Sequence, residues 1–416
     1  MSAIVDMWKA DPSTEQLCYA KLLAAVKETN ATWSLSEKRL KAILKEFNLQ
    51  PNKELYTYVK NTKTETDPEV VLSQLPKAVQ IQMTKARGKG LFATRNITQQ
   101  QELWSEIPVI QSPPPELLAI MRNGNACAFC GTALRTADGH LRSRSGGISC
   151  MACPANWCNS NCKQQNKLHP ELYHGSSRRT KFNTLAWHKY EQFCTENNWN
   201  AGIIYGLFLV SKLTAESKSI TSAFYDSLAK VGQDLRQKAV NEEKSLDYEL
   251  LETMWKKGYQ ILASVVEKTY QLSYQEFLEG IGMVNINNLG GAIYLTHSHL
   301  NHSCNPNINV ERLGRAEGIK ITAKADIIAG QELTTSYVDP RLSYDQRQYK
   351  LRINWGFICS CERCRSEKSA PSTDQSNTLS KSRRKSVRFE QNPVTSLQEV
   401  LTVQPPIQVL KASELQ

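Results

Sequence analysis

The 416-residue sequence has no apolar run that approaches the roughly 20 residues of a membrane-spanning helix. Its first residues, MSAIVDMWKADPSTEQ, lack the basic and apolar stretches of a secretory signal. We therefore expect no membrane partner and a reducing compartment, in which the twelve cysteines do not pair as disulfides. Nine of them lie in two clusters whose spacing is typical of metal ligands, so the sequence predicts bound zinc.

Acidic residues are the scarcer charge, with 40 Asp and Glu against 51 Lys and Arg, which gives a net charge of +11. A basic balance favours acidic partners such as DNA, RNA or a nucleosome surface. The charge is spread along the chain without a basic stripe that carries interleaved aromatics, so solubility alone explains it equally well. To bind a basic peptide, the protein would need a locally acidic groove, which the net charge of the whole chain does not reveal.

Hydrophobic periodicity divides the chain into segments. Residues 1–77 have apolar positions at helical spacing and predict an N-terminal helical accessory region, while residues 78–124 and 281–340 have short β-branched runs that predict strands. Residues 177–280 return to helical spacing. The two β-rich pieces predict one sheet domain with insertions, of the α+β class.

The last segment, residues 369–416, is rich in Ser, Thr, Gln and Lys and predicts a disordered basic tail. Its basic run SKSRRKSVR at 380–388 fits a nuclear import signal. Within it, KSVRF fits a phosphatase docking peptide and Ser386 fits a basophilic kinase site, although motifs this short also arise by chance.

Eight possible metal ligands lie within 48 residues: Cys127, Cys130, Cys150, Cys153, Cys158, Cys162, His169 and His174. A spacing of two residues lets both thiolates of one turn reach the same ion, so the set suits two tetrahedral zinc ions. A cross-braced arrangement would give one zinc Cys127, Cys130, Cys158 and Cys162, and the other Cys150, Cys153, His169 and His174. Reduced structural cysteines without metal and redox cysteines are the alternatives.

The order of these ligands and the segment WCNSNC at 157–162 resemble a MYND zinc finger, here over residues 125–176. That family usually closes with a His, three residues and a Cys. In this chain His169 is followed by four residues and His174, so the eighth ligand stays open, with Cys194 as the other candidate.

Three further motifs lie in the β-rich pieces. They are RGKGLFA at 87–93, LNHSCNPN at 300–307 and GQELTTSY at 330–337. The paired glycines of the first let the backbone approach a ligand closely. In order and spacing the three motifs resemble those of a SET domain.

The SET resemblance implies S-adenosylmethionine as the cofactor and Tyr337 as the catalytic tyrosine. The cofactor-binding residues that it implies are Lys89, Gly90, Asn285, Asn301, His302, Tyr337 and Phe357. Asn301 and the backbone of His302 would hold the methionine portion and the adenine, and Phe357 would lie against the adenine.

The second cysteine cluster is Cys359, Cys361 and Cys364, which leaves a tetrahedral zinc one ligand short. In SET proteins the cysteine of the Asn-His-Ser-Cys motif, here Cys304, completes a post-SET zinc. The resemblance therefore implies a third zinc, which would close residues 341–368 over the catalytic end of the sheet.

A MYND finger between two halves of a SET domain resembles the SMYD lysine methyltransferases. The N-terminal extension, ENNWNA at 196–201 and VNINN at 284–288 look like the fungal members numbered five in the yeast SET series. This implies an enzyme that methylates histone lysines, on histone H4 in that subfamily. We further expect a monomer that acts in the nucleus, on the chromosome and also in the cytoplasm. Methylation of other proteins, an inactive SET and MYND adaptor, and a nucleic-acid binder are the alternatives.

Overall fold

The computed structural model describes residues 4–7, 19–30, 32–46, 56–65, 67–85, 87–134, 147–174, 181–214, 220–240 and 246–369. The chain divides into two compact units, Met1–Tyr56 and Thr57–Gln416. None of the described helices is long and apolar enough to cross a membrane. The predicted basic tail beyond residue 369, with its short motifs at 380–389, lies outside the described residues.

The described residues of the first unit include the amphipathic helices α2 (Tyr19–Thr29) and α3 (Glu37–Glu46). Leu22 and Val26 of α2 are buried together with Leu40 and Leu44 of α3 in one apolar cluster, as their helical spacing predicts. The helicity that we expected up to residue 77 does not continue into the second unit. There the helical elements among the described residues of 57–77 are η2 (Val59–Asn61) and α4 (Glu69–Leu72).

The second unit contains the four-stranded sheet that joins the three motifs of the sequence. Its order is β1-β2-β11-β8, with β1 at Val79–Thr84, β2 at Gly88–Ala93, β11 at Glu332–Thr335 and β8 at Asn301–His302. Strand β11 pairs antiparallel with β2 and parallel with β8. Segments more than 200 residues apart in the sequence, Gly88–Ala93 and Asn301–His302, therefore flank the same strand.

Two more sheets complete the β-rich part. The first has the order β3-β10-β9, with β3 at Glu102–Glu106, β10 at Gly318–Ala323 and β9 at Ile308–Gly314. The second pairs β4 (Ile110–Gln111) with β7 (Ala292–Ile293). Inward-facing residues of the four-stranded and three-stranded sheets form one core, which includes Leu91, Trp104, Ile319, Ile321 and Leu333.

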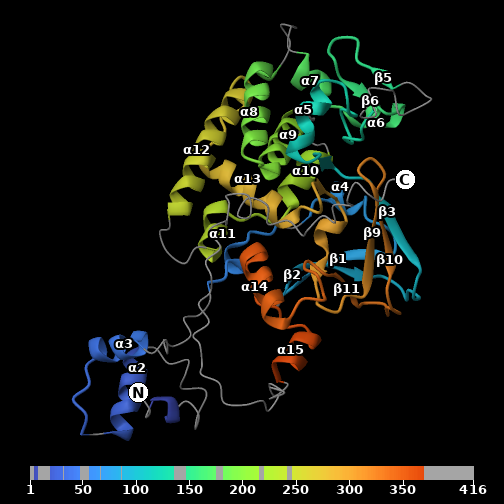
Figure 1. The fold of residues 1–416 in the computed structure, drawn as a ribbon. Coiled ribbons are helices and arrows are strands. Elements are labelled where there is room, and N and C mark those ends of the chain that lie inside the picture. The colour runs from blue at the N-terminus through green and yellow to red at the C-terminus, as the bar shows by residue number, and fades with distance from the viewer. Residues whose placement is uncertain are drawn as a thin grey trace, which may run out of the picture. The chain divides into compact units, whose positions relative to one another are not determined.

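Helices α8–α13 gather on one side of this unit, away from the strands (Figure 1). The helices are α8 (Thr184–Glu196), α9 (Asn200–Thr214), α10 (Ile220–Ser227), α11 (Gln233–Val240), α12 (Leu246–Val266) and α13 (Tyr274–Asn287). They share a large core that is rich in aromatic residues. Ser273 and Glu276 form a capping box at the start of α13, and this helix continues to Asn287, beyond the end that we expected at residue 280.

Two smaller pieces complete the unit. Helix α5 (Pro115–Arg122) leads into the cysteine-rich module, which contains β5 (Ile148–Ser149), β6 (Asn156–Trp157), α6 (Ser160–Gln165) and α7 (His169–Tyr173). After the sheet come α14 (Tyr344–Trp355) and α15 (Glu362–Ser369). Helix α14 is capped by Gly356, whose φ of 76° is a left-handed conformation that favours glycine.

Candidate active site and metal centres

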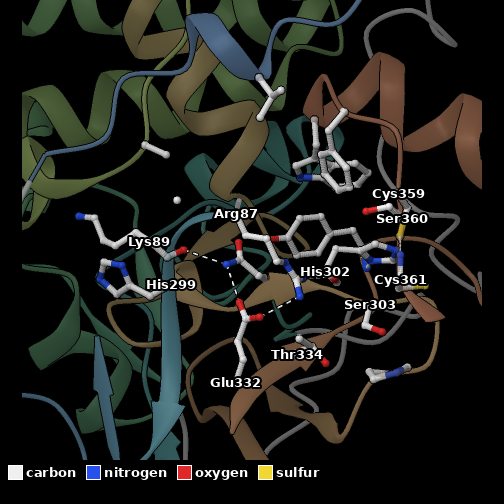
Figure 2. Close-up of a pocket in the computed structure, with 18 of the residues that line it drawn as sticks. Arg87, Lys89, His299, His302, Ser303, Glu332, Thr334, Cys359, Ser360 and Cys361 are labelled. Atoms are coloured by element: carbon white, nitrogen blue, oxygen red, sulfur yellow. Dashed lines mark hydrogen bonds and ion pairs between the residues drawn. The ribbon is translucent and has the colours of Figure 1, made fainter. Parts of the chain in front are cut away.

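A cavity with a volume of about 1370 Å³ lies where the three motifs meet. Its walls include residues that the sequence places far apart, namely Arg87, Gly88, Lys89, Asn301, His302, Tyr337 and Phe357. Figure 2 shows Arg87 and Glu332 in the middle of this pocket, Lys89 and His299 at one end, and Cys359 and Ser360 at the other. The predicted tyrosine and the predicted cofactor-binding loop thus face one space.

The side chain of Asn301 is fixed by two hydrogen bonds. Its Nδ2 donates to the carbonyl oxygen of Lys89 at 2.9 Å and to Oε1 of Glu332 at 2.8 Å. Both N–H groups of the amide are therefore used, and its oxygen is the atom that can accept a hydrogen bond from a ligand. A Cβ on Gly90 would lie 2.8 Å from Asn301 Nδ2 and 2.8 Å from Glu332 Oε1, which explains glycine there.

Glu332 and Arg87 are site residues that we did not predict. Arg87 Nη1 donates to Glu332 Oε2 at 2.8 Å, and Arg87 Nη2 donates to the carbonyl oxygen of His302. Glu332 thus receives hydrogen bonds from Arg87 and Asn301 and holds two motifs in register. The sequence offered one signal for this ion pair. Glu332 begins strand β11, and Arg87 precedes the glycine pair of β2 in the same sheet.

Tyr337 is held at both its backbone and its hydroxyl. Its hydroxyl donates to the carbonyl oxygen of Leu300 at 2.6 Å, and its backbone N–H donates to Nδ1 of His302 at 3.0 Å. Its ring centroid lies 5.0 Å from that of Trp355. Burial raises the pKa of Tyr337 well above its ordinary value, so its hydroxyl stays protonated at neutral pH.

The remaining predicted cofactor residues are placed differently. The ring of Phe357 lines the cavity with its centroid 6.5 Å from that of Tyr337. Asn285 does not line the cavity, because its amide turns away and donates to Gln233 Oε1 at 2.9 Å. Asn287, two residues further along α13, lines the cavity instead.

Twelve cysteine and histidine side chains form three groups of four, and within each group the ligand atoms lie within 4.8 Å of one another. The groups are Cys127, Cys130, Cys158 and Cys162; Cys150, Cys153, His169 and His174; and Cys304, Cys359, Cys361 and Cys364. Tetrahedral zinc with sulfur ligands at about 2.3 Å sets sulfur atoms roughly 3.8 Å apart. The Cys130–Cys158 distance is 3.7 Å, and Cys304 lies 4.0 Å from Cys359 and 3.4 Å from Cys364, so the donors fit zinc.

The structure brings the eight ligands of the first module together in the cross-braced arrangement. The eighth position is occupied by His174, whose Nε2 lies 3.2 Å from the sulfur of Cys150. Cys194, the other candidate, is buried in the helical core, where it is close to Gly202. It belongs to none of the three groups.

Cys304 connects the third group to the cavity. Because Nδ1 of His302 accepts a hydrogen bond from Tyr337, its Nε2 carries the proton and donates toward the sulfur of Cys304, 3.3 Å away. The buried guanidinium of Arg347 donates from Nε to the same sulfur at 3.3 Å. Hydrogen bonds from Cys359, His302 and Arg347 lower the pKa of Cys304 to about 3, which favours the thiolate that binds metal.

A family model of the SET domain matches residues 88–338, which include the strands and the cavity walls described above. The chain belongs to the SET-domain family. It is 41% identical over 369 residues to "Histone-lysine N-methyltransferase SET5" of Yarrowia lipolytica, a match that covers 88% of this chain and 81% of that protein. Proteins with the same description from Scheffersomyces stipitis and Candida albicans are each 37% identical and cover 93% and 88% of this chain, and 84% and 80% of their own lengths.

Together with the domain, these relatives make the chain a SET-domain protein-lysine N-methyltransferase. Among solved structures, "Structure of Rubisco LSMT bound to Sinefungin and Monomethyllysine" is 12% identical. Its TM-score is 0.35, over 70% of this chain and 54% of that one. This distant likeness contributes nothing to the assignment of individual residues.

Proposed function

We propose that this protein transfers a methyl group from S-adenosylmethionine to lysine side chains of histones, with the tail of histone H4 as the first substrate to test. The observation that carries the proposal is the single cavity that Arg87–Lys89, Asn301, His302, Tyr337 and Phe357 share. The relatives' description as histone-lysine N-methyltransferases supports the choice of histones.

The residues around the cavity fit S-adenosylmethionine, which would supply an activated methyl group when bound. The amide oxygen of Asn301 and the ammonium of Lys89 suit its amino-acid end, and Phe357 offers an aromatic face to its adenine. Gly90 does not line the cavity, and its role in this proposal is to leave room for the side chains of Asn301 and Glu332. Asn287 replaces Asn285 in this proposal, because it is the asparagine of α13 that lines the cavity.

Methyl transfer requires a neutral lysine amine in line with the methyl group, so the main task of the site is alignment. Deprotonating a free lysine, with a pKa near 10.4, costs roughly 3 to 5 kcal/mol at pH 7 to 8. A desolvated channel lowers that pKa. The oxygen of Tyr337, whose proton is directed to Leu300, orients the amine and the methyl group by accepting polar and weak CH···O contacts.

His302 does not act as a general base in this proposal. Its Nδ1 accepts the backbone N–H of Tyr337, and its Nε2 faces the sulfur of Cys304. Both ring nitrogens are therefore engaged in holding the site, and neither is directed to the substrate amine.

We also propose that the three groups of ligands bind three structural zinc ions. Two would stabilise a MYND-like module at residues 125–176, and the post-SET zinc would fix residues 341–368 beside the cavity. The predicted domain boundaries, the monomeric state, the contact with nucleic acid and the nuclear, chromosomal and cytoplasmic location belong to this proposal. The relatives' description as histone methyltransferases supports the nuclear part of that location.

The test is a transfer assay with tritiated S-adenosylmethionine on free histones, nucleosomes and cell extract, followed by mass spectrometry of labelled proteins. We expect label on lysines of histone H4 with the wild type and, over the same time, much less label with Tyr337→Phe. Label on other proteins alone would favour the non-histone alternative. Absence of both transfer and calorimetric binding of S-adenosylhomocysteine would favour the adaptor.

A further inference from the structure

A segment outside the matched SET domain contributes to the walls of the same cavity. We call residues 57–67 the strap, of which residue 66 is not described. The strap belongs to the second compact unit. The strap residues that line the cavity are Thr57, Val59, Lys60, Thr62 and Thr64.

The start of the strap is attached next to Phe357. The backbone N–H groups of Tyr58 and Val59 donate to the carbonyl oxygen of Gly356 at 3.1 and 3.0 Å. The fully buried hydroxyl of Tyr58 donates to the carbonyl oxygen of Ile353 at 3.3 Å. A Cβ on Gly356 would lie 2.4 Å from the ring of Tyr58, so the strap packs directly on the residue before Phe357.

The middle of the strap pairs with the loop that follows α10. The N–H of Lys63 donates to the carbonyl oxygen of Lys230 at 2.8 Å, and the N–H of Lys230 donates back to Lys63 at 3.0 Å. Ser227, Leu228 and Ala229, just before Lys230, line the cavity. The strap therefore closes one side of the pocket between this loop and Gly356.

The end of the strap places a carboxylate beside Lys89. Asp67 Oδ2 lies 2.8 Å from Lys89 Nζ, and the two side chains are only 2% and 6% exposed. Lys89 Nζ also donates to the carbonyl oxygen of Ser227 at 2.9 Å. An ammonium has three N–H donors, so these two contacts fix its position and leave one donor for a ligand.

A buried histidine lies beside this ion pair. His299 Nε2 lies 3.6 Å from Asp67 Oδ1, and neither atom has a hydrogen-bond partner among the described residues. A buried ion pair is costly to form and contributes little net stability, and its cation, Lys89, lines the cavity, which points to a role for the cation. Figure 2 shows Lys89 and His299 together at the end of the pocket away from Cys359 and Ser360.

We propose that Asp67 is a positioning residue for the cofactor. Asp67 fixes the position of the Lys89 ammonium, so that its remaining N–H donates to the carboxylate at the amino-acid end of S-adenosylmethionine. This inference rests on the proposed function. It adds that the SET domain of residues 88–338 binds its cofactor fully only with the strap in place.

The test compares two nucleosides in full-length protein by calorimetric titration and competition. S-adenosylhomocysteine has the amino-acid end, whereas 5′-methylthioadenosine lacks it. In Asp67→Asn we expect the dissociation constant for S-adenosylhomocysteine to rise about tenfold or more, as for loss of a charge-assisted contact, and that for 5′-methylthioadenosine to stay unchanged. Equal weakening of both nucleosides would mean a merely structural role and would overturn the proposal.

The matched control is Lys63→Met, a substitution on the same strap. It removes the 2.7 Å ion pair between Lys63 Nζ and Oε1 of Glu279 in α13. The side chain of Lys63 is 66% exposed and does not line the cavity, so both affinities should stay at the wild-type values. If the wild type binds no S-adenosylhomocysteine, the proposed function fails as well. If the wild type binds it and Asp67→Asn binds it equally well, only the present inference fails.

A measurement on the wild type avoids any folding defect of the variant. Amide hydrogen exchange in the peptide that covers residues 57–67 should slow more with saturating S-adenosylhomocysteine than with saturating 5′-methylthioadenosine. The same protection with both nucleosides, or none with either, would overturn the role of the strap.

Discussion

At the scale of single residues, the hydroxyl of Tyr337 can be removed without loss of the backbone hydrogen bond that holds the residue in place. Replacement by Phe removes the hydroxyl but keeps the backbone N–H that donates to His302 Nδ1 at 3.0 Å. We expect Tyr337→Phe to lower the rate of methyl transfer about 100-fold, the order of magnitude for loss of one preorganised polar group. Single-turnover transfer of tritium measures the rate, and calorimetry should give a wild-type affinity for S-adenosylhomocysteine. Unchanged turnover would remove Tyr337 from the mechanism.

Arg347 offers a second prediction at this scale, because its side chain is 1% exposed and its Nε lies 3.3 Å from the sulfur of Cys304. A positive charge beside four thiolates stabilises the metal site, and loss of such an outer contact typically costs 10- to 100-fold in metal affinity. We expect Arg347→Met to release one zinc per chain to a chromogenic chelator at least about tenfold faster. Arg341→Met, which breaks an ion pair at an 85% exposed side chain, is the control and should release zinc at the wild-type rate.

The residues found only in the structure show what a sequence pattern leaves out. Lys89, Asn301 and Tyr337 lie in motifs that are compact in sequence, so their convergence could be predicted from the resemblance. Glu332 and Asp67 have their roles through partners 31 and 22 positions away, Asn301 and Lys89. No local spacing encodes such a contact, because it arises from strand pairing and from the path of the strap.

At the scale of elements, the register of α13 decides which asparagine reaches the cavity. Successive residues of a helix are rotated by about 100°, so Asn285 and Asn287 point in directions roughly 160° apart. The sequence predicted that an asparagine near the end of this segment contacts the cofactor, but it did not predict which face of the helix turns toward the cavity. Ligand spacing was more informative, because two cysteines in one turn must face the same side whatever the surrounding fold.

The last segment of the second unit, with α14 and α15, supports a prediction about the post-SET zinc. Cys361 is half-buried and belongs to the third group of ligands, whereas Cys153 belongs to the second. Cys361→Ser should lose one zinc, free the segment that carries Phe357 and raise the dissociation constant for S-adenosylhomocysteine. Cys153→Ser should also lose zinc but leave that constant unchanged, because its group does not adjoin the cavity. Zinc analysis and calorimetry on both variants test this, and equal affinities would contradict it.

At the scale of the whole molecule, the sequence predicted an α+β chain whose two β-rich pieces form one domain around insertions. The SET match over residues 88–338 and the sheet order β1-β2-β11-β8 agree with that organisation. The place of the strap in the cavity wall could not be predicted, because the apolar pattern grouped its residues with the helical region before them. Its backbone is paired with Gly356 and Lys230, partners more than 160 positions later in the sequence.

Stability of the whole molecule should fall in mild acid through its buried histidines. Burial lowers the pKa of His297, beside Arg312, and of His299, beside Asp67 and Lys89, to about 4 each. The unfolded chain takes up these protons near pH 6.5, so the stabilisation is complete above that pH and is lost as the pH falls toward 4.

His297→Leu isolates one of these contributions. Between pH 7 and 5 the free energy of unfolding of the wild type should decrease by roughly 2 kcal/mol more than that of His297→Leu, because 1.5 pH units below 6.5 correspond to about that amount. Glu106, which accepts the N–H of His297, has a raised pKa and acts in the opposite direction in both proteins. Urea unfolding at the two pH values with excess zinc measures the difference. Equal decreases in the two proteins would show that His297 is protonated in the folded state, in conflict with its burial.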